Sequence, residues 1–309
     1  MVTRVTTPGS YSAVLNNLLA AQQRQLEAGN KVSTQRNGQD LKDYARSSEL
    51  ITAMRSVQTR LGVYQDQNKL LADKLTTQDT ALIRVADAAQ SVRQVFSEAL
   101  ASGRVDTLVE DVQAQFSAAI EAMNARYGGK YLFAGGQVDT RPVTATTLSD
   151  LTSGPPIASF FANDDFKVTA KLDEATNVTI GFLADDIGTS MLTAFQAFQA
   201  FNQGPSGPFA GALTDAQRTF LEGQLASWET VREDVTLLAA RNGTNQKRLD
   251  TIAADLEGRQ NTLAGMLGDI TDADMAEAAA QLQQAQLSVQ SVAYVFQALQ
   301  QSSLLNILK

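Results

Sequence analysis

Two long stretches of this sequence contain no proline, and this feature constrains the fold more than any other. The six prolines leave residues 9–141 and 209–309 free of this residue. Proline lacks a backbone donor and clashes with the preceding helical turn, so a chain that avoids it over such lengths is free to form long helices. The other five prolines after Pro8 lie from Pro142 to Pro208, where we expect the chain to turn.

The first proline-free stretch carries an apolar pattern with an unbroken 4-3 spacing from Leu50 to Phe96. This spacing is typical of a coiled-coil seam. We expect another helix after Asp106, and a similar 3-or-4 spacing recurs between Leu221 and Leu267. The sequence therefore predicts a mainly α protein, an elongated antiparallel helical bundle or coiled-coil rod.

Between the two stretches the character of the sequence changes. Residues 166–172 alternate apolar and polar side chains, and residues 177–183 are also typical of a strand. We interpret this part as a small β-rich tip module inserted at one end of the rod. The predicted division is a terminal domain of residues 1–45 plus 269–309, a helical shaft of 46–136 plus 189–268, and the inserted module of 137–188.

Both ends of the chain are amphipathic but almost uncharged. Glu277 is the only charged residue between 275 and 308, and Arg4 is the only one between 1 and 23. Charge depletion is typical of interface cores, which predicts an assembly surface. Periodicity does not separate this from packing within one chain, so an intramolecular coiled coil stays an alternative. The predicted assembly-interface residues are Leu15, Leu19, Leu26, Met275, Leu282, Val289, Val292, Phe296 and Leu299.

The composition argues against several function classes. The chain has no cysteine and no histidine, which removes the commonest general base and the commonest metal ligands. Its net charge of −8 disfavours nucleic-acid and anionic membrane surfaces. Asp269, Asp272 and Asp274 suggest the start of a helix more than a cation site. We predict no enzyme activity, catalytic residue, cofactor or metal site, and no nucleic-acid or membrane partner.

At this point the sequence is similar to a known family. Residues 31–50 resemble the stretch in which flagellin-family proteins pass from the terminal helix to the long shaft helix. Residues 269–282 and 302–309 resemble the C-terminal segment of the same family, and residues 238–249 resemble another segment that its members share. The resemblance covers both terminal thirds of the chain.

Within the family, one short run resembles the signature of the members at the junction between hook and filament. The run lies in residues 127–136 and is followed by Asp139 to Pro142. Its glycine pairs predict a hairpin or tight reversal. The junction-signature residues are Tyr131, Leu132, Phe133, Ala134 and Gly135.

The resemblance implies a structural subunit that connects the hook-associated ring to the flagellin filament. It further implies export by the flagellar type III apparatus without a cleaved signal peptide, termini that stay disordered until assembly, and an extracellular flagellar location. The implied partners are further copies of the chain in a ring, the hook-associated ring protein, flagellin and an export chaperone. The alternatives are a filament subunit like flagellin itself and a secreted coiled-coil adhesin.

Overall fold

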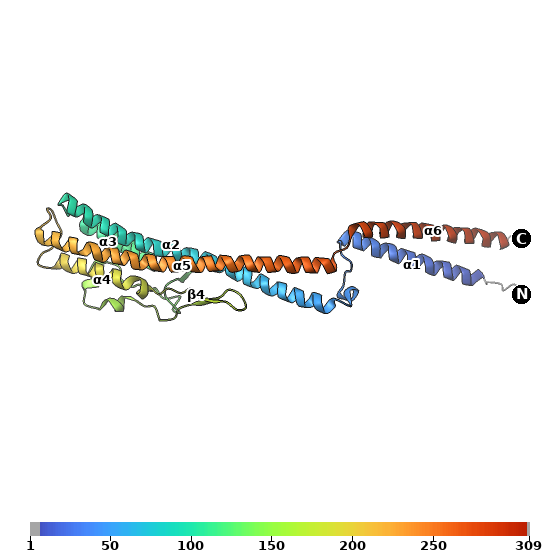
Figure 1. Cartoon of the computed structure of the whole chain (residues 1–309), viewed down its shortest axis with the longest axis horizontal. Coiled ribbons are helices and arrows are strands. Elements are labelled where there is room, and N and C mark those ends of the chain that lie inside the picture. The colour runs from blue at the N-terminus through green and yellow to red at the C-terminus, as the bar shows by residue number, and fades with distance from the viewer. Residues whose placement is uncertain (1–6, 308–309) are drawn as a thin grey trace. The chain divides into compact units, whose positions relative to one another are not determined.

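The fold is mainly helical, which confirms the predicted fold class (Figure 1). The computed structural model describes residues 7–307, with side chains for residues 12–300. The chain forms two compact units: unit 1 comprises Met1–Arg60 and Gly258–Lys309, and unit 2 comprises Leu61–Glu257. Helices α2 (Ser48–Ser102) and α5 (Asp215–Thr271) contribute residues to both units. The predicted three-part division of the chain stays a prediction.

Most of the predicted seam of α2 is buried. At its start Leu50 is 50% exposed, because the neighbouring Ile51 takes the buried position. Further along, the predicted positions lie in the core of unit 2. The fully buried apolar members of the seam are Leu61, Leu75, Leu82, Val85, Ala89, Val92 and Phe96.

The core of unit 2 is formed by α2, α5 and two shorter helices, α3 (Leu108–Met123) and α4 (Ala184–Gln203). The ring centre of Trp228 on α5 lies 6.4 Å from that of Phe96 and 4.7 Å from that of Phe195. Phe195 on α4 in turn lies 5.2 Å from Phe116 on α3. These edge-to-face contacts tie all four helices together.

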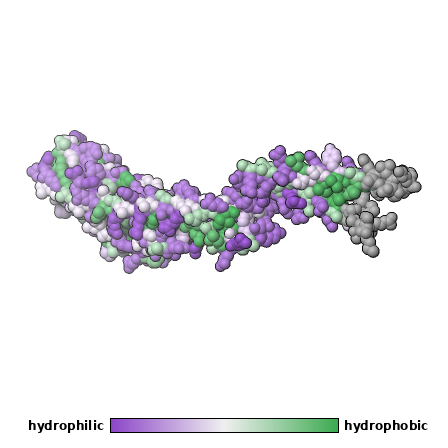
Figure 2. Space-filling model, turned by 45° about the vertical axis from the view of Figure 1, so that its right-hand side comes forward, coloured by the Kyte–Doolittle hydropathy of each residue, from purple (hydrophilic) through white to green (hydrophobic). Residues whose placement is uncertain are grey.

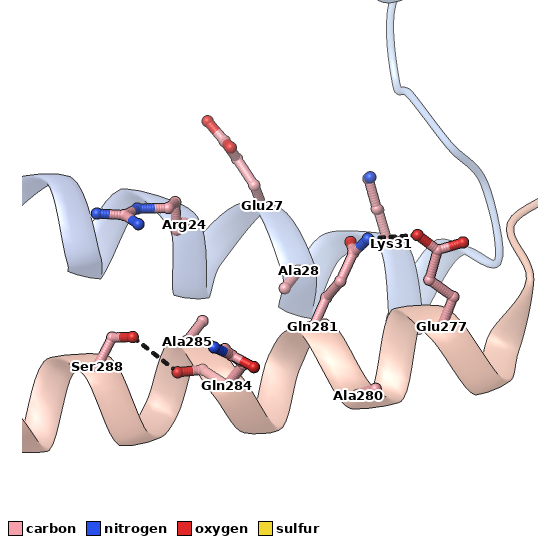
Figure 3. Close-up of a pocket in the computed structure, with 10 residues that line it drawn as sticks. All are labelled: Arg24, Glu27, Ala28, Lys31, Glu277, Ala280, Gln281, Gln284, Ala285 and Ser288. Carbon is pink, nitrogen blue, oxygen red and sulfur yellow. Dashed lines mark hydrogen bonds between the residues drawn. The ribbon is translucent and has the colours of Figure 1, made fainter.

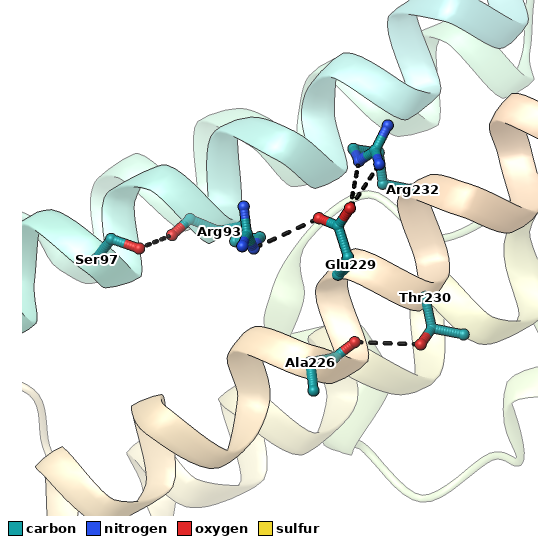
Figure 4. A network of polar contacts seen from close by, with 6 residues as sticks. All are labelled: Arg93, Ser97, Ala226, Glu229, Thr230 and Arg232. Carbon is teal, nitrogen blue, oxygen red and sulfur yellow. Dashed lines mark hydrogen bonds and ion pairs between the residues drawn. The ribbon is translucent and has the colours of Figure 1, made fainter.

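A polar network joins α2 to α5 beside this core (Figure 4). Glu229 accepts hydrogen bonds from Arg232, and Nε of Arg93 on α2 lies 3.4 Å from its other carboxylate oxygen. The hydrogen bonds from Arg232 are the main reason that the pKa of Glu229 is lowered. The two long helices are therefore held in register by charge as well as by apolar packing.

The inserted module contains less strand than predicted. Strand β3 (Thr169–Lys171) pairs with β4 (Asn177–Thr179) in a short antiparallel hairpin, and the 3-10 helices η2 (Leu148–Thr152) and η3 (Ile157–Phe160) precede it. Phe166 lies outside the strand and is 61% exposed. Alternation alone overestimated the strand because it does not show where pairing with a partner strand ends.

Amide side chains in the seams hold this hairpin in place. Buried Asn68 donates a hydrogen bond to the carbonyl of Leu172 at 3.0 Å, and buried Gln78 donates to the carbonyl of Ile180 at 3.4 Å. From α5, Asn245 also donates to the hairpin. The hairpin therefore packs against α2 and α5.

Strands β1 (Arg126–Tyr127) and β2 (Lys130–Tyr131) form a second hairpin, as predicted from its glycines. Gly128 and Gly129 have φ of 58° and 82°, which glycine adopts without steric cost. In unit 1, α1 (Thr7–Thr34) and the 3-10 helix η1 (Leu41–Tyr44) precede α2, and α6 (Met275–Ile307) follows α5. No helix in the described part of the chain combines the length and apolarity needed to span a membrane.

Candidate assembly site

Helices α1 and α6 lie side by side in unit 1 and run antiparallel (Figure 1). Alanines occupy the buried centre of the pair: Ala21 and Ala28 come from α1, and Ala278 and Ala285 come from α6. Small side chains at these positions let the two helix backbones approach closely. The pair is therefore narrow, and it buries little large apolar surface of its own.

The predicted interface residues of α6 lie on the face that is turned toward α1. This face combines the two buried alanines with half-buried larger side chains at a 4-3 spacing. The half-buried predicted residues are Leu282, Val289, Val292, Phe296 and Leu299. Met275, at the start of the helix, is 40% exposed.

The predicted interface residues of α1 lie on a different face from the one that packs against α6. Leu15, Leu19 and Leu26 are 46%, 56% and 68% exposed. On a helix a shift of one residue turns a side chain by about 100°, so this stripe points away from the pair. The sequence analysis found an apolar stripe of α1 but not the stripe that contacts α6.

The seam of α1 that contacts α6 was missed. It also has a 4-3 spacing, and this spacing could have revealed it in the sequence. It was passed over because alanine and glutamine dilute its apolar character, whereas the leucine stripe beside it is more hydrophobic. The seam consists of Val14, Leu18, Ala21, Gln25, Ala28 and Val32, each buried or half-buried.

Outward-facing apolar side chains also occur on α6. Leu287, Tyr294 and Val295 are 57%, 74% and 52% exposed. Leu287 and Tyr294 are seven positions apart and so share one face. Figure 2 shows apolar surface on unit 1. Apolar patches of this kind mark interaction sites on soluble proteins.

A pocket of about 420 Å³ lies along one side of the helix pair (Figure 3). Ala28 and Ala285 contribute to its lining, and charged or amide side chains surround them. Gln281 donates a hydrogen bond to Glu277 at 2.9 Å, one turn away on α6. This mixture of alanine and polar side chains suits helix packing, and it offers no nucleophile and base held together for catalysis among the pocket-lining residues.

At the other end of the pair, the chain leaving α1 is tied to the turn between α5 and α6. The backbone N–H of Asn37 donates to the carbonyl of Thr271 at 2.8 Å, and its side-chain amide donates to the carbonyl of Asp272 at 2.8 Å. In the other direction, the N–H of Ala273 donates a hydrogen bond to the carbonyl of Gln35 at 3.0 Å. We call residues 35–44 with 268–274 the clasp.

Two carboxylates organise the helix starts within the clasp. Asp43 accepts hydrogen bonds from the backbone N–H groups of Asp40 and Gln39, which lower its pKa. Asp274 accepts from the N–H groups of Ala276 and Glu277, so it caps α6. Asp274 therefore caps the helix whose start the sequence suggested in this acidic segment.

The junction-signature residues form a turn that is mostly buried in unit 2. Leu132, Phe133 and Ala134 are 7%, 0% and 0% exposed, and Tyr131 is half-buried. Gly135 has φ of 68°, and a Cβ there would lie 2.1 Å from Oδ1 of Asp164. These residues thus fix the turn against the inserted module, and Tyr131 has the most exposed side chain of the run.

Comparison with known families gives the identity of the chain. The bacterial flagellin N-terminal helical region matches residues 5–137, and the bacterial flagellin C-terminal helical region matches residues 225–308. This chain belongs to the bacterial flagellin family. Flagellin-family proteins are structural components of the extracellular flagellum, and α1 and α6 lie inside the two matched regions.

Solved structures share the fold of this flagellin-family chain. A flagellar hook-associated protein from Vibrio parahaemolyticus matches with a TM-score of 0.61 at 15% identity, covering 74% of this chain and 100% of that chain. FlgL from Bacillus cereus matches with a TM-score of 0.53 at 12% identity, covering 71% of this chain and 99% of that chain. FlgL from Xanthomonas campestris matches with a TM-score of 0.54 at 12% identity, covering 69% of this chain and 98% of that chain. No curated relative matches the chain.

Proposed function

We propose that this flagellin-family chain is the subunit that joins the hook to the filament. The observation that carries the proposal is the second apolar stripe of α1. Leu15, Leu19 and Leu26 stay exposed while a different face of α1 packs against α6. Burying a leucine side chain contributes about 1.5–3 kcal/mol, so this stripe offers a neighbouring subunit a substantial stabilisation.

The proposed assembly region comprises residues 1–45 and 269–309, and it includes the predicted interface residues of α6. In this proposal these segments order fully when neighbouring copies cover their apolar faces, and the copies close into a ring. The charge-poor composition of both segments supports this, because few charges must be desolvated on assembly.

The junction role within the flagellum is supported by two independent similarities. The solved structures that share the fold include a flagellar hook-associated protein and two FlgL proteins. The run from Tyr131 to Gly135 resembles the signature of junction members. The proposed partners are the hook-associated ring protein on one side, flagellin on the other, and an export chaperone. The proposed route is the flagellar type III apparatus, without a cleaved signal peptide and without any catalytic role.

The test compares Leu26→Asp with Leu237→Asp in cells that lack the native copy. Both leucines are similarly exposed, at 68% and 63%, but Leu237 lies on α5 in unit 2. We expect Leu26→Asp to fold and to be secreted, yet to leave hooks without filaments in electron micrographs. Leu237→Asp should restore filaments. Normal filaments with Leu26→Asp would refute assembly through this stripe.

The second candidate is a filament subunit, because both family regions that match the chain are those of flagellin. Deleting the chain separates the two roles. Loss of the junction subunit leaves hooks and releases flagellin into the medium, whereas loss of the filament subunit leaves hooks with no flagellin in the medium.

A further inference from the structure

A pocket of about 340 Å³ lies in unit 2, where α3 meets the β1–β2 hairpin. Two arginines, Arg126 and Arg141, line it together with Tyr131. The chain as a whole has 33 acidic and 25 basic residues, so paired guanidinium groups in one pocket run against its overall charge. The pocket has no role in the apolar assembly site of unit 1.

One of the two guanidinium groups is held in position by aromatic stacking. The guanidinium of Arg126 lies 4.1 Å from the ring centre of Tyr131 and also donates a hydrogen bond to the Tyr131 hydroxyl. That hydroxyl accepts from Arg126, so its own hydrogen remains available to another acceptor. Stacking leaves the edge of the guanidinium free to donate.

The second guanidinium has no partner in the described part of the chain. Arg141 forms no ion pair and no side-chain hydrogen bond with any described residue. An arginine side chain carries five N–H donors in a planar fork that matches a carboxylate. Both arginines are exposed, and the pocket brings the guanidinium of Arg141 together with the remaining N–H groups of Arg126.

The nearby carboxylates are already engaged elsewhere. Glu121 lines the pocket, but its carboxylate pairs with Arg84 on α2 at 3.4 Å. Asp150 lies four positions after the pocket residue Thr146, and it accepts hydrogen bonds from the backbone N–H groups of Thr146 and Thr147. Neither carboxylate forms an ion pair with Arg126 or Arg141 among the described residues.

We propose that this pocket binds a carboxylate group of an aspartate or glutamate on an adjacent protein subunit. Arg126, Arg141 and the Tyr131 hydroxyl supply the donors, and charge-assisted bonds of this kind are the strongest that a surface pocket offers. The identity of the adjacent chain rests on the proposed function, since an acidic subunit packed beside this one supplies such groups. Binding of the carboxylate itself does not depend on assembly.

The test uses the full-length chain in solution and measures peptide binding by ligand-detected NMR at low salt. The probe is a capped tetra-glutamate peptide, and a capped tetra-glutamine peptide and inorganic phosphate are the comparisons. We expect Arg141→Gln to weaken binding of the glutamate peptide about tenfold or more, because it removes charge-assisted hydrogen bonds. Tyr131→Phe keeps the aromatic ring and should weaken binding less.

Arg248→Gln is the matched control, because Arg248 is an exposed arginine of unit 2 outside this pocket. The affinity of Arg248→Gln for the glutamate peptide should stay at the wild-type value. Equal losses in Arg141→Gln and Arg248→Gln, or equal binding of the glutamine peptide, would overturn the site. Phosphate binding as tight as the glutamate peptide would assign the pocket to free anions instead. Leu26→Asp should bind the peptide like wild type, which separates this test from that of assembly.

Discussion

The hydroxyl of Tyr44 donates a hydrogen bond to the carbonyl of Thr271 at 3.2 Å, across 227 positions of sequence. The same hydroxyl accepts from the N–H of Gly38 at 2.9 Å, and the Gly38 carbonyl at 3.0 Å shares its hydrogen with that of Thr271. A single phenol thus adds a link between the chain that leaves α1 and the end of α5, beside the hydrogen bonds of Asn37 and Ala273 in the clasp.

Tyr44→Phe should loosen the clasp, because it removes the hydroxyl but keeps the ring. The expected cost is about 1 kcal/mol, the usual net contribution of a hydrogen bond. Faster hydrogen exchange at the amides of Asn37 and Ala273 would report it. The control is Tyr294→Phe, since Tyr294 is 74% exposed. Unchanged protection of both amides in Tyr44→Phe would contradict the role given to the hydroxyl.

Gly135→Ala should destabilise unit 2 more than Gly128→Ala. Both glycines have positive φ, so alanine costs about 1–2 kcal/mol at either position. A Cβ at Gly135 would collide with Asp164, whereas a Cβ at Gly128 would have no atom within 4 Å. Denaturation followed by the fluorescence of Trp228, the only tryptophan, measures the difference. Equal stability of the two variants would mean that the contact with Asp164 is relieved without cost.

Phe198→Ala should destabilise unit 2 by about 3–5 kcal/mol, the usual effect of emptying a buried phenylalanine site. The ring centre of Phe198 lies 5.6 Å from that of Phe96 and 5.1 Å from that of Phe209. Phe166→Ala makes the same change at an exposed position and should alter stability by less than about 0.5 kcal/mol. Urea denaturation of both variants would show the contrast, and similar midpoints would argue against this core.

The lowered pKa of Asp150 should make the stability of unit 2 depend on pH. Hydrogen bonds from Thr146 and Thr147 lower its pKa from 3.8 to about 2. Because the folded pKa is lowered, the stabilisation is present above the unfolded pKa and is lost as the pH falls from 3.8 toward about 2. Asp150→Asn should therefore be less stable than wild type at neutral pH and equal to it near the folded pKa. Exposed Asp234→Asn is the charge-matched control, and an equal pH profile for both variants would contradict the assignment.

The sequence predicted the long helices well and the faces of the terminal helices less well. Proline-free stretches and the 4-3 spacing up to Phe96 identified α2, because a long seam leaves one consistent choice of buried face. In α1 the sequence offers two stripes, and the sequence analysis identified the leucine stripe, a predicted assembly surface, but not the stripe that packs against α6. Which stripe is buried depends on the partner helix, which spacing does not reveal.

Polar residues within the seams were equally beyond prediction. Asn68 and Gln78 interrupt an apolar pattern, and their role depends on a hairpin about a hundred positions away along the chain. The arginine pocket was missed for the same reason. Arg126 lies in β1 and Arg141 lies in the loop after β2, and only the folded chain brings them to one pocket.

The two stripes of α1 restrict how this helix is able to vary. Successive residues on a helix lie about 100° apart, so Leu18 and Leu19 belong to different faces, one toward α6 and one outward. In the proposed assembly a substitution at either position disturbs a contact, and inserting one residue would turn every later side chain of α1 by about 100° and move the seam away from α6. A complete mutational scan should therefore find tolerance in α1 confined to the remaining face that includes Asn16 and Gln23, whereas the solvent face of α5 accepts most changes.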